Sequence, residues 1–291
     1  MNPFLDYECF ECIAKLAFYI GKLSSSGVEE SLKKSSLLIE GFARAALESL
    51  GDYVELSARI AEHVATVVGD PYAGIRKRSM EVAKRLLPAA ERYVEEGGDP
   101  LRRAACVAAA ANALDFATGV YSASLEAFEK EFEGRLREPF AIDHVAELEK
   151  AVKRAERALY VLDNAGECVF DLPLVKLLSE GCSVTVAARG APVFNDASIE
   201  EAREAGLDRY AELTTTGCRV PGISASRCSP GFLKLLAESD LVVLKGQGNF
   251  QSFADVAKVR GKPAFYLLVP KCGPVARYLG APLGAKVAVK K

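Results

Sequence analysis

The sequence predicts an α/β protein, with an N-terminal α-helical bundle followed by a doubly wound α/β/α sandwich that has a mostly parallel sheet. Up to about residue 150, apolar side chains recur at the three- and four-residue spacing of amphipathic helices. Beyond it, apolar runs of strand length alternate with helical segments. The length of 291 residues favours two domains, because a domain commonly has ~100–200 residues. We therefore expect a helical domain at residues 1–150 and an α/β domain at residues 151–291.

Glycine and proline separate the helical segments of the first half. The helical spacing is clearest in residues 13–20 and 54–68, and the chain breaks near Gly51, at 69–71 and at 97–100. Residues 101–128 are rich in alanine, which predicts a central helix against which neighbouring helices pack closely. A helical bundle is the simplest arrangement of these segments.

The second half follows a polar connecting helix at residues 143–157. Five runs have the length and composition of strands: 158–162, 183–187, 241–244, 264–269 and 286–289. Predicted helices between them include 168–180, 197–205 and 231–238. Ser198 and Glu201 have the spacing of a capping box, and Ser229-Pro230 precede the last of these helices. This alternation is typical of parallel βαβ units.

Charge and composition argue against several classes of protein. With 37 basic and 39 acidic residues, the chain carries no basic surplus for nucleic acid or an anionic membrane. No apolar run approaches the ~18–20 residues of a membrane span, and the first six residues lack the basic start of a signal peptide. Eight dispersed cysteines in a chain of this size are typical of a reduced protein. We expect a cytoplasmic protein without nucleic-acid or membrane partners.

Polar side chains follow three of the predicted strands. Asp163, Asn164 and Glu167 come after the first, and Arg189 and Asp196 after the second. Because the carboxyl ends of parallel strands share one edge of a sheet, these groups should converge where α/β proteins bind ligands. Carboxylate and amide oxygens suit a hard divalent cation, although each acid could equally be a helix N-cap.

The third strand is followed by Lys245-Gly246-Gln247-Gly248-Asn249. A lysine and two glycines offer positive charge and backbone N–H groups to phosphate oxygens. The order of residues matches neither a P-loop nor a dinucleotide-binding fingerprint, and the segment could also be a tight turn from strand to helix.

Two motifs of the helical half could also serve a site. Asn112 and Asp115 lie three residues apart on one face of the alanine-rich helix, so they are either bonded inside the bundle or directed at a cleft.

Cys9 and Cys12 form a single CxxC pair. A structural zinc needs four ligands, and the sequence has no second pair to complete such a site.

Together these motifs resemble the metal-dependent damage-control phosphatases, in the short form of archaea and bacteria. The resemblance spans essentially the whole chain. It includes Cys9-x-x-Cys12, Asp70-Pro-Tyr72 with Lys77, Asn112-x-x-Asp115-Phe116, Asp163-Asn-Ala-Gly-Glu167, Pro192-Val-Phe-Asn-Asp196, Thr216-Gly217, Pro221-Gly222, Leu244-Lys-Gly-Gln-Gly-Asn-Phe250 and Lys271-Cys272. Two positions depart from the pattern: Ala111 stands where the family usually has Gly, and Gln251 where it usually has Glu.

The resemblance implies a divalent metal (Mn²⁺, Co²⁺, Ni²⁺ or Mg²⁺) held by Asp163, Asn164 and Asp196. It implies that Asp163, Asp196 and Lys245 are catalytic, with Lys245 pairing with the substrate phosphate. The helical half would cover the cleft. The expected substrate-binding residues are Asn112, Asp115, Glu167, Arg189, Gly246, Gly248 and Asn249.

The implied activity is hydrolysis of small phosphate monoesters, such as sugar phosphates or damaged and surplus phosphometabolites, including phosphopantetheine derivatives. Attack by water activated at the metal and attack by Asp163 or Asp196 to form an acyl phosphate are both open. The main alternative is a module that binds a phosphometabolite or nucleotide without turnover, and a small-molecule methyltransferase is a weaker one. The sequence leaves the physiological substrate, the metal and the oligomeric state open.

Overall fold

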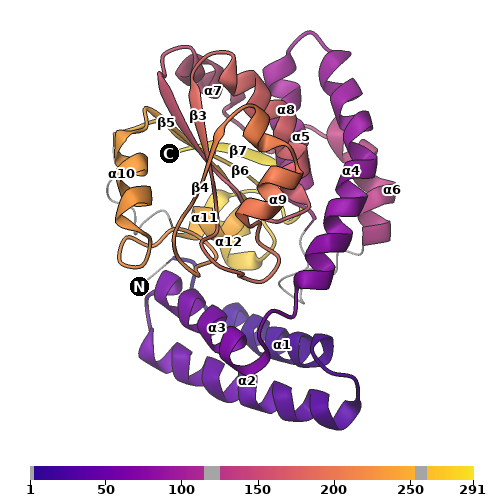
Figure 1. Ribbon diagram of the computed structural model, residues 1–291, viewed down its shortest axis with the longest axis vertical. Coiled ribbons are helices and arrows are strands. Elements are labelled where there is room, and N and C mark those ends of the chain that lie inside the picture. The colour runs from indigo at the N-terminus through magenta and orange to yellow at the C-terminus, as the bar shows by residue number, and fades with distance from the viewer. Residues whose placement is uncertain (1–2, 115–124, 253–260) are drawn as a thin grey trace.

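The centre of the molecule is a mostly parallel β-sheet. A computed structural model describes residues 3–114, 125–252 and 261–291 (Figure 1). Within these residues the sheet has the strand order β1-β7-β6-β5-β2-β3-β4, and only β6 and β7 are antiparallel neighbours. The strands are β1 (Ile142–Asp143), β2 (Arg157–Val161), β3 (Ser183–Ala188), β4 (Glu212–Thr215), β5 (Leu241–Lys245), β6 (Ala264–Leu268) and β7 (Val287–Lys290). The predicted fold class is therefore confirmed.

The sheet is buried on both faces, which explains why its strands read as continuous apolar runs. Side chains of the central strands alternate between two cores. Along β2, Leu159 and Val161 belong to one core, and Tyr160 belongs to the other. Helices therefore cover both faces, as in other doubly wound folds.

The chain reverses its direction of progress across the sheet between β2 and β5. From β2 it runs outward to β3 and β4, and then returns to β5 on the opposite side of β2. The parallel pairing of Val161 with Leu244 brings the carboxyl ends of β2 and β5 side by side. Such a switch point leaves a crevice beyond the ends of β2 and β5, because the connections that follow these two strands leave in opposite directions across the sheet.

The helices of the first half form two groups (Figure 1). The lower group in Figure 1 comprises α1 (Tyr7–Leu23), α2 (Val28–Glu48) and α3 (Tyr53–Val68), which have an apolar core of their own that includes Ile20, Leu38 and Phe42. The second group lies beside the sheet and comprises α4 (Ala73–Glu95), α5 (Pro100–Ala111) and α6 (Leu125–Arg137).

This grouping differs from the predicted division at residue 150. Buried side chains of the second group, such as Met80, Val107 and Phe132, share one core with the sheet residues Tyr160 and Val186. The strand β1 also lies before residue 150 and pairs with β7. The helical spacing of the sequence cannot distinguish these groups, because it gives the apolar face of a helix but not its partner.

Four of the remaining helices correspond to predicted ones, with ends that differ by up to five residues, and the last two in chain order were not predicted. The remaining helices are α7 (Val145–Val152), α8 (Glu167–Ser179), α9 (Ile199–Glu204), α10 (Pro230–Glu238), α11 (Gly246–Gln251) and α12 (Gly273–Leu279), with a 3₁₀ turn at Leu207–Arg209. The capping box of Ser198 and Glu201 and the Ser229 cap are both present. None of the described helices combines the length and apolar character that crossing a membrane requires.

Two strands, β1 and β4, were not predicted from the sequence. The first has only two residues, and the second, Glu-Leu-Thr-Thr, is partly exposed at one edge of the sheet. Their short or polar sequences lack the apolar run on which strand prediction depends.

Candidate active site

Two loops at the carboxyl edge of the sheet are joined through their backbones. The Ala197 N–H donates to the carbonyl of Asp163 at 2.7 Å, and an isolated antiparallel bridge links Asn164 with Asp196. The loop after β2 and the loop after β3 are therefore held side by side. This pairing brings the three residues expected to hold a metal, Asp163, Asn164 and Asp196, to one place.

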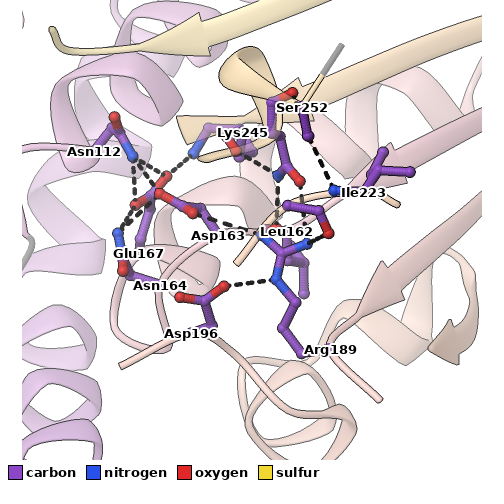
Figure 2. A network of polar contacts seen from close by, with 12 residues as sticks. Asn112, Leu162, Asp163, Asn164, Glu167, Arg189, Asp196, Ile223, Lys245 and Ser252 are labelled. Carbon is purple, nitrogen blue, oxygen red and sulfur yellow. Dashed lines mark hydrogen bonds and ion pairs between the residues drawn. The ribbon is translucent and has the colours of Figure 1, made fainter. Parts of the chain in front are cut away.

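Arg189 connects these two loops to the one that follows β5 (Figure 2). Its Nε donates to Asp196 Oδ2 at 2.6 Å, and its Nη2 lies 3.8 Å from Asp163 Oδ1. Its Nη1 donates to the Gly222 carbonyl at 3.0 Å and to Asn249 Oδ1 at 3.1 Å. Because the side chain is buried within these contacts, Arg189 orients the site rather than lining its cavity.

Lys245 contacts buried acids of the site and does not line the cavity described below. Its ammonium group is fully buried, and donates to Glu167 and, at 2.8 Å, to Asp171 Oδ1. Burial alone would lower the pKa of Lys245, but the attraction of Asp171 and Glu167 raises it above its ordinary value. The group is therefore a charged partner of two carboxylates. The expected contact with a substrate phosphate would require it to leave both of them.

Asn112 joins the end of α5 to the acids (Figure 2). Its Nδ2 donates to Asp163 Oδ2 at 2.9 Å and to Glu167 Oε2 at 2.9 Å, while its Oδ1 accepts from the Val269 N–H at 2.9 Å. The prediction left open whether Asn112 was bonded internally or faced a cleft, and the structure shows that it is bonded. Asp115 lies outside the described residues.

Asn164 directs its amide protons at the same two carboxylates. Its Nδ2 donates to Asp163 Oδ2 at 3.0 Å and to Glu167 Oε2 at 2.9 Å. The side-chain carbonyl oxygen then lies on the other side of the amide group, and Asn164 lines the cavity described below. Glu167 is fully buried, and its carboxylate accepts hydrogen bonds from Asn112, Asn164 and Lys245. It therefore orients these three side chains.

The glycines of the loop after β5 allow close approach of other groups. Gly246 has a φ of 79°, and a Cβ at this position would lie 1.8 Å from Asp163 Oδ2. A Cβ on Gly248 would lie 2.2 Å from the carbonyl oxygen of Pro221. Asn249 donates from Nδ2 to the Lys245 carbonyl at 2.6 Å, so it shapes the loop from within. Only glycine permits this packing without displacing Asp163 or the Pro221 segment.

Several buried acids gather at the site. Four acidic side chains are buried here: Asp163, Glu167, Asp171 and Asp196. Arg189 and Lys245 form ion pairs with them. Burial, reinforced by the charges of Glu167 and Asp196, raises the pKa of Asp163 well above its usual range. Burial also raises the pKa of Asp171 to about 6, against the opposing effect of Lys245. A cation bound beside Asp163 would oppose this shift and favour its charged form.

A cavity of about 370 Å³ opens above the acids. Asp163, Asn164, Asp196 and Lys271 line it. Many of its other lining residues come from α1 and α3. The size falls within the range of small-molecule sites.

The donor groups of Asp163, Asn164 and Asp196 fit a hard divalent cation. Two carboxylates and an amide oxygen are the ligands that Mg²⁺ and Mn²⁺ prefer. In the ranges that the structure describes, no three His, Cys, Asp or Glu side chains gather as a metal cluster. The expected set has only two acids and an amide, so water or substrate oxygens would have to complete the coordination.

Two charged residues of the site were missed from the sequence. Asp171 follows Glu167 by one helical turn, so an acid pair at i, i+4 in the otherwise apolar first half of α8 was the available signal. Lys271 was noticed only as part of a family motif. Its place in the cavity depends on the loop after β6, and no local pattern predicts it.

The fold and the site define an α/β protein with an acidic, oxygen-rich crevice at the switch point of its sheet, under a helical cover. The sequence model described as "Damage-control phosphatase ARMT1-like domain" matches residues 5–287. The chain belongs to this damage-control phosphatase family, as its motifs predicted.

Individual relatives agree with this assignment over nearly their full lengths. The chain is 33% identical to a protein of Archaeoglobus fulgidus named "Damage-control phosphatase", covering 96% of each chain. It is 29% identical to "Damage-control phosphatase PH1575" of Pyrococcus horikoshii, covering 98% of each. The crystal structure of the DUF89 family protein PH1575 superposes with a TM-score of 0.83 at 27% identity, again over 98% of both chains.

Proposed function

We propose that the chain is a metal-dependent phosphatase that hydrolyses small phosphate monoesters of metabolites. The observation that carries this proposal is the joining of Asp163, Asn164 and Asp196 at the end of one cavity. The family to which the chain belongs supports phosphatase chemistry in metabolite repair. All eight cysteines are free thiols, which supports the expected reducing, cytoplasmic location.

In this proposal Asp163, Asn164 and Asp196 hold the cation, which is the ligand set that the family resemblance implies. When bound, the cation would neutralise phosphate oxygens and lower the pKa of water. The surrounding residues orient the ligands. Asn112 and Asn164 donate to Asp163 Oδ2, and Arg189 holds Asp196, so each acid has one oxygen restrained. Such restraint reduces reorganisation during the reaction.

The positive charge facing the substrate is assigned to Lys271 rather than to Lys245. Lys271 lines the cavity, whereas Lys245 is enclosed by Glu167 and Asp171. Lys245 then has a positioning role, because it fixes the carboxylate that accepts from both asparagines. The attacking group is either water or an Asp carboxylate, since Asp163 and Asp196 both lie at the cavity.

A metal-supplemented screen of phosphate monoesters tests the proposal. Release of phosphate with Mn²⁺, Co²⁺, Ni²⁺ or Mg²⁺, and none with chelator, is the expected result. Elemental analysis of the purified protein identifies the bound metal. Binding of phosphate esters without turnover under every metal would instead favour the phosphometabolite-binding module.

A further inference from the structure

We propose that Cys218 and Cys228 are an oxidation site, at which hydrogen peroxide converts the two thiols reversibly into a disulfide bond. Both residues lie in the segment that connects β4 with α10. The inference goes beyond the proposed function and does not depend on it. It rests on the distance between the two sulfur atoms, on the groups that surround them, and on the contacts of the segment between them.

The two sulfur atoms lie 2.9 Å apart, although the residues are ten positions apart in the chain. One thiol can therefore donate to the other. A disulfide bond is about 2.05 Å long, so the sulfur atoms need to approach each other by only about 0.9 Å. Both side chains are buried, and hydrogen bonds fix the backbone next to them. The Cys228 N–H donates to the Ser224 carbonyl at 3.0 Å, and the Gly190 N–H donates to the Cys218 carbonyl at 3.2 Å.

The surroundings of the two thiols make Cys218 the one that reacts first. The hydrogen bond with Cys228 lowers the pKa of Cys218 to about 7, against the opposing effect of burial. The positive charges of Arg189 and Arg227 act in the same direction as this hydrogen bond. The same hydrogen bond, together with burial, raises the pKa of Cys228. Because the thiolate is the nucleophile in such reactions, Cys218 attacks the oxidant and Cys228 attacks second.

The oxidation takes two steps and consumes one peroxide. The Cys218 thiolate attacks an oxygen atom of hydrogen peroxide, which breaks the O–O bond, forms a sulfenic acid and releases hydroxide. The Cys228 sulfur then attacks the Cys218 sulfur and displaces its hydroxyl group, which leaves as water with the proton of the Cys228 thiol. Overall, two thiols are oxidised to a disulfide and one peroxide is reduced to two waters. A small thiol reverses the change by exchange.

The segment between the two cysteines contacts the candidate active site. The Gly222 carbonyl accepts from Arg189 Nη1 at 3.0 Å, and the Ile223 N–H donates to Ser252 Oγ at 2.9 Å (Figure 2). Pro221 lines the cavity. A disulfide bond would close a loop around these three residues while moving its ends little. Oxidation should therefore make the segment more rigid and stabilise the fold.

Peptide mapping of the peroxide-treated full-length protein tests the inference. The protein is first reduced and freed of reductant, then treated with hydrogen peroxide while folded, and finally alkylated with iodoacetamide as it is unfolded. Arg219 and Arg227 lie between the two cysteines, so trypsin separates them and a disulfide appears as two linked peptides. The expected result is a link between Cys218 and Cys228 that dithiothreitol removes.

Cys228→Ser tests the order of the two steps. Without the second thiol, Cys218 should remain a sulfenic acid, which dimedone labels when it is added during unfolding. Peroxide should raise the melting temperature of the wild type by about 5 °C, and this rise should be absent in Cys228→Ser. The matched control is Cys182→Ser, because the half-buried Cys182 donates to the Leu178 carbonyl and lies outside the pair. It should form the link as the wild type does.

Three results with the wild type would overturn the inference. Peroxide could leave both cysteines as alkylated thiols, it could join either of them to another cysteine, or the link could form only after unfolding. These measurements require neither metal nor substrate. Phosphate release by the reduced protein is measured separately, so failure of the proposed function is distinguishable from failure of this inference.

Discussion

Asn112 Nδ2 lies 2.9 Å from Asp163 Oδ2, so a residue at the end of α5 restrains an acid at the end of β2. The contact spans 51 positions of the chain and is fully enclosed, since Asn112 has no exposed surface. The same amide group also donates to Glu167, which in turn accepts from Lys245. The orientation of Asp163 therefore depends on a buried network that extends from α5 to β5.

Asp163→Asn should abolish most of the activity, because it removes a carboxylate from the expected metal ligands. We expect a loss of about a hundredfold or more in kcat/KM. Elemental analysis should find less bound metal in this variant. The matched control is Asp208→Asn at an exposed position, which should behave as wild type. Full activity of Asp163→Asn would remove this residue from the proposed site.

Gly246→Ala should displace Asp163 and destabilise the fold. The added Cβ would lie 1.8 Å from Asp163 Oδ2, and a φ of 79° is strained for alanine. We expect a loss of about 1–3 kcal/mol in the free energy of unfolding, measured with urea, and a large loss of activity. Gly231→Ala in α10 is the control, since a Cβ there meets nothing within 4 Å. Equal behaviour of both variants would contradict the close packing at Gly246.

Lys245→Met distinguishes a positioning role from contact with substrate. Removing the buried ammonium leaves Glu167 and Asp171 without their cation, which should cost about 3–5 kcal/mol of unfolding free energy. Lys176→Met, at an exposed position on α8, should change it by no more than about 0.5 kcal/mol. If Lys245→Met were as stable as wild type and only bound substrate more weakly, the positioning role would be wrong. The contact between Lys245 and the substrate phosphate, expected from the sequence, would then be the better explanation.

Glu55 should stabilise the protein in a way that depends on pH. Hydrogen bonds from Arg227, at 2.8 Å to each carboxylate oxygen, lower the pKa of Glu55 to about 2 and tie α3 to the loop before α10. Because the folded-state pKa lies below the ordinary value of 4.5, this contribution is complete above pH 4.5 and is lost as the pH falls through 2. Partial exposure limits it to about 1 kcal/mol.

Urea unfolding of Glu55→Gln across this pH range checks the prediction. The variant should be less stable than wild type at pH 7, and the difference should vanish near pH 2. The exposed pair of Glu40 and Arg44 supplies the control, Glu40→Gln, which should differ little from wild type at any pH. A stability difference for Glu55→Gln that persists unchanged at pH 2 would contradict the assigned cause.

Much of the strand pattern and the meeting of the strand-end residues could be predicted, because both follow from local rules. Apolar runs such as Leu241–Lys245 predict buried strands, and parallel strands necessarily present their carboxyl ends at one edge. Asp163 and Asp196 follow two such strands, so their proximity followed from the fold class alone. The capping box at Ser198 was predictable for the same reason, since it depends on residues three apart.

The direction of a buried side chain was not predictable in this way. Lys245 was expected at the substrate because a lysine before two glycines suits phosphate, but its partners are Glu167 and Asp171 on α8. The grouping of α4, α5 and α6 with the sheet likewise depends on which apolar faces meet across the chain.

The sequence by itself determined the α/β class, most strands and helices, the family, and the set of polar residues at the sheet edge. These depend on spacing within a few residues, which local backbone geometry converts directly into structure. Only the tertiary structure decided which acids neutralise Lys245, that Lys271 lines the cavity, and that α1 and α3 line it as well. Such contacts join residues far apart in the chain, where packing and charge balance decide the outcome and no local pattern encodes it.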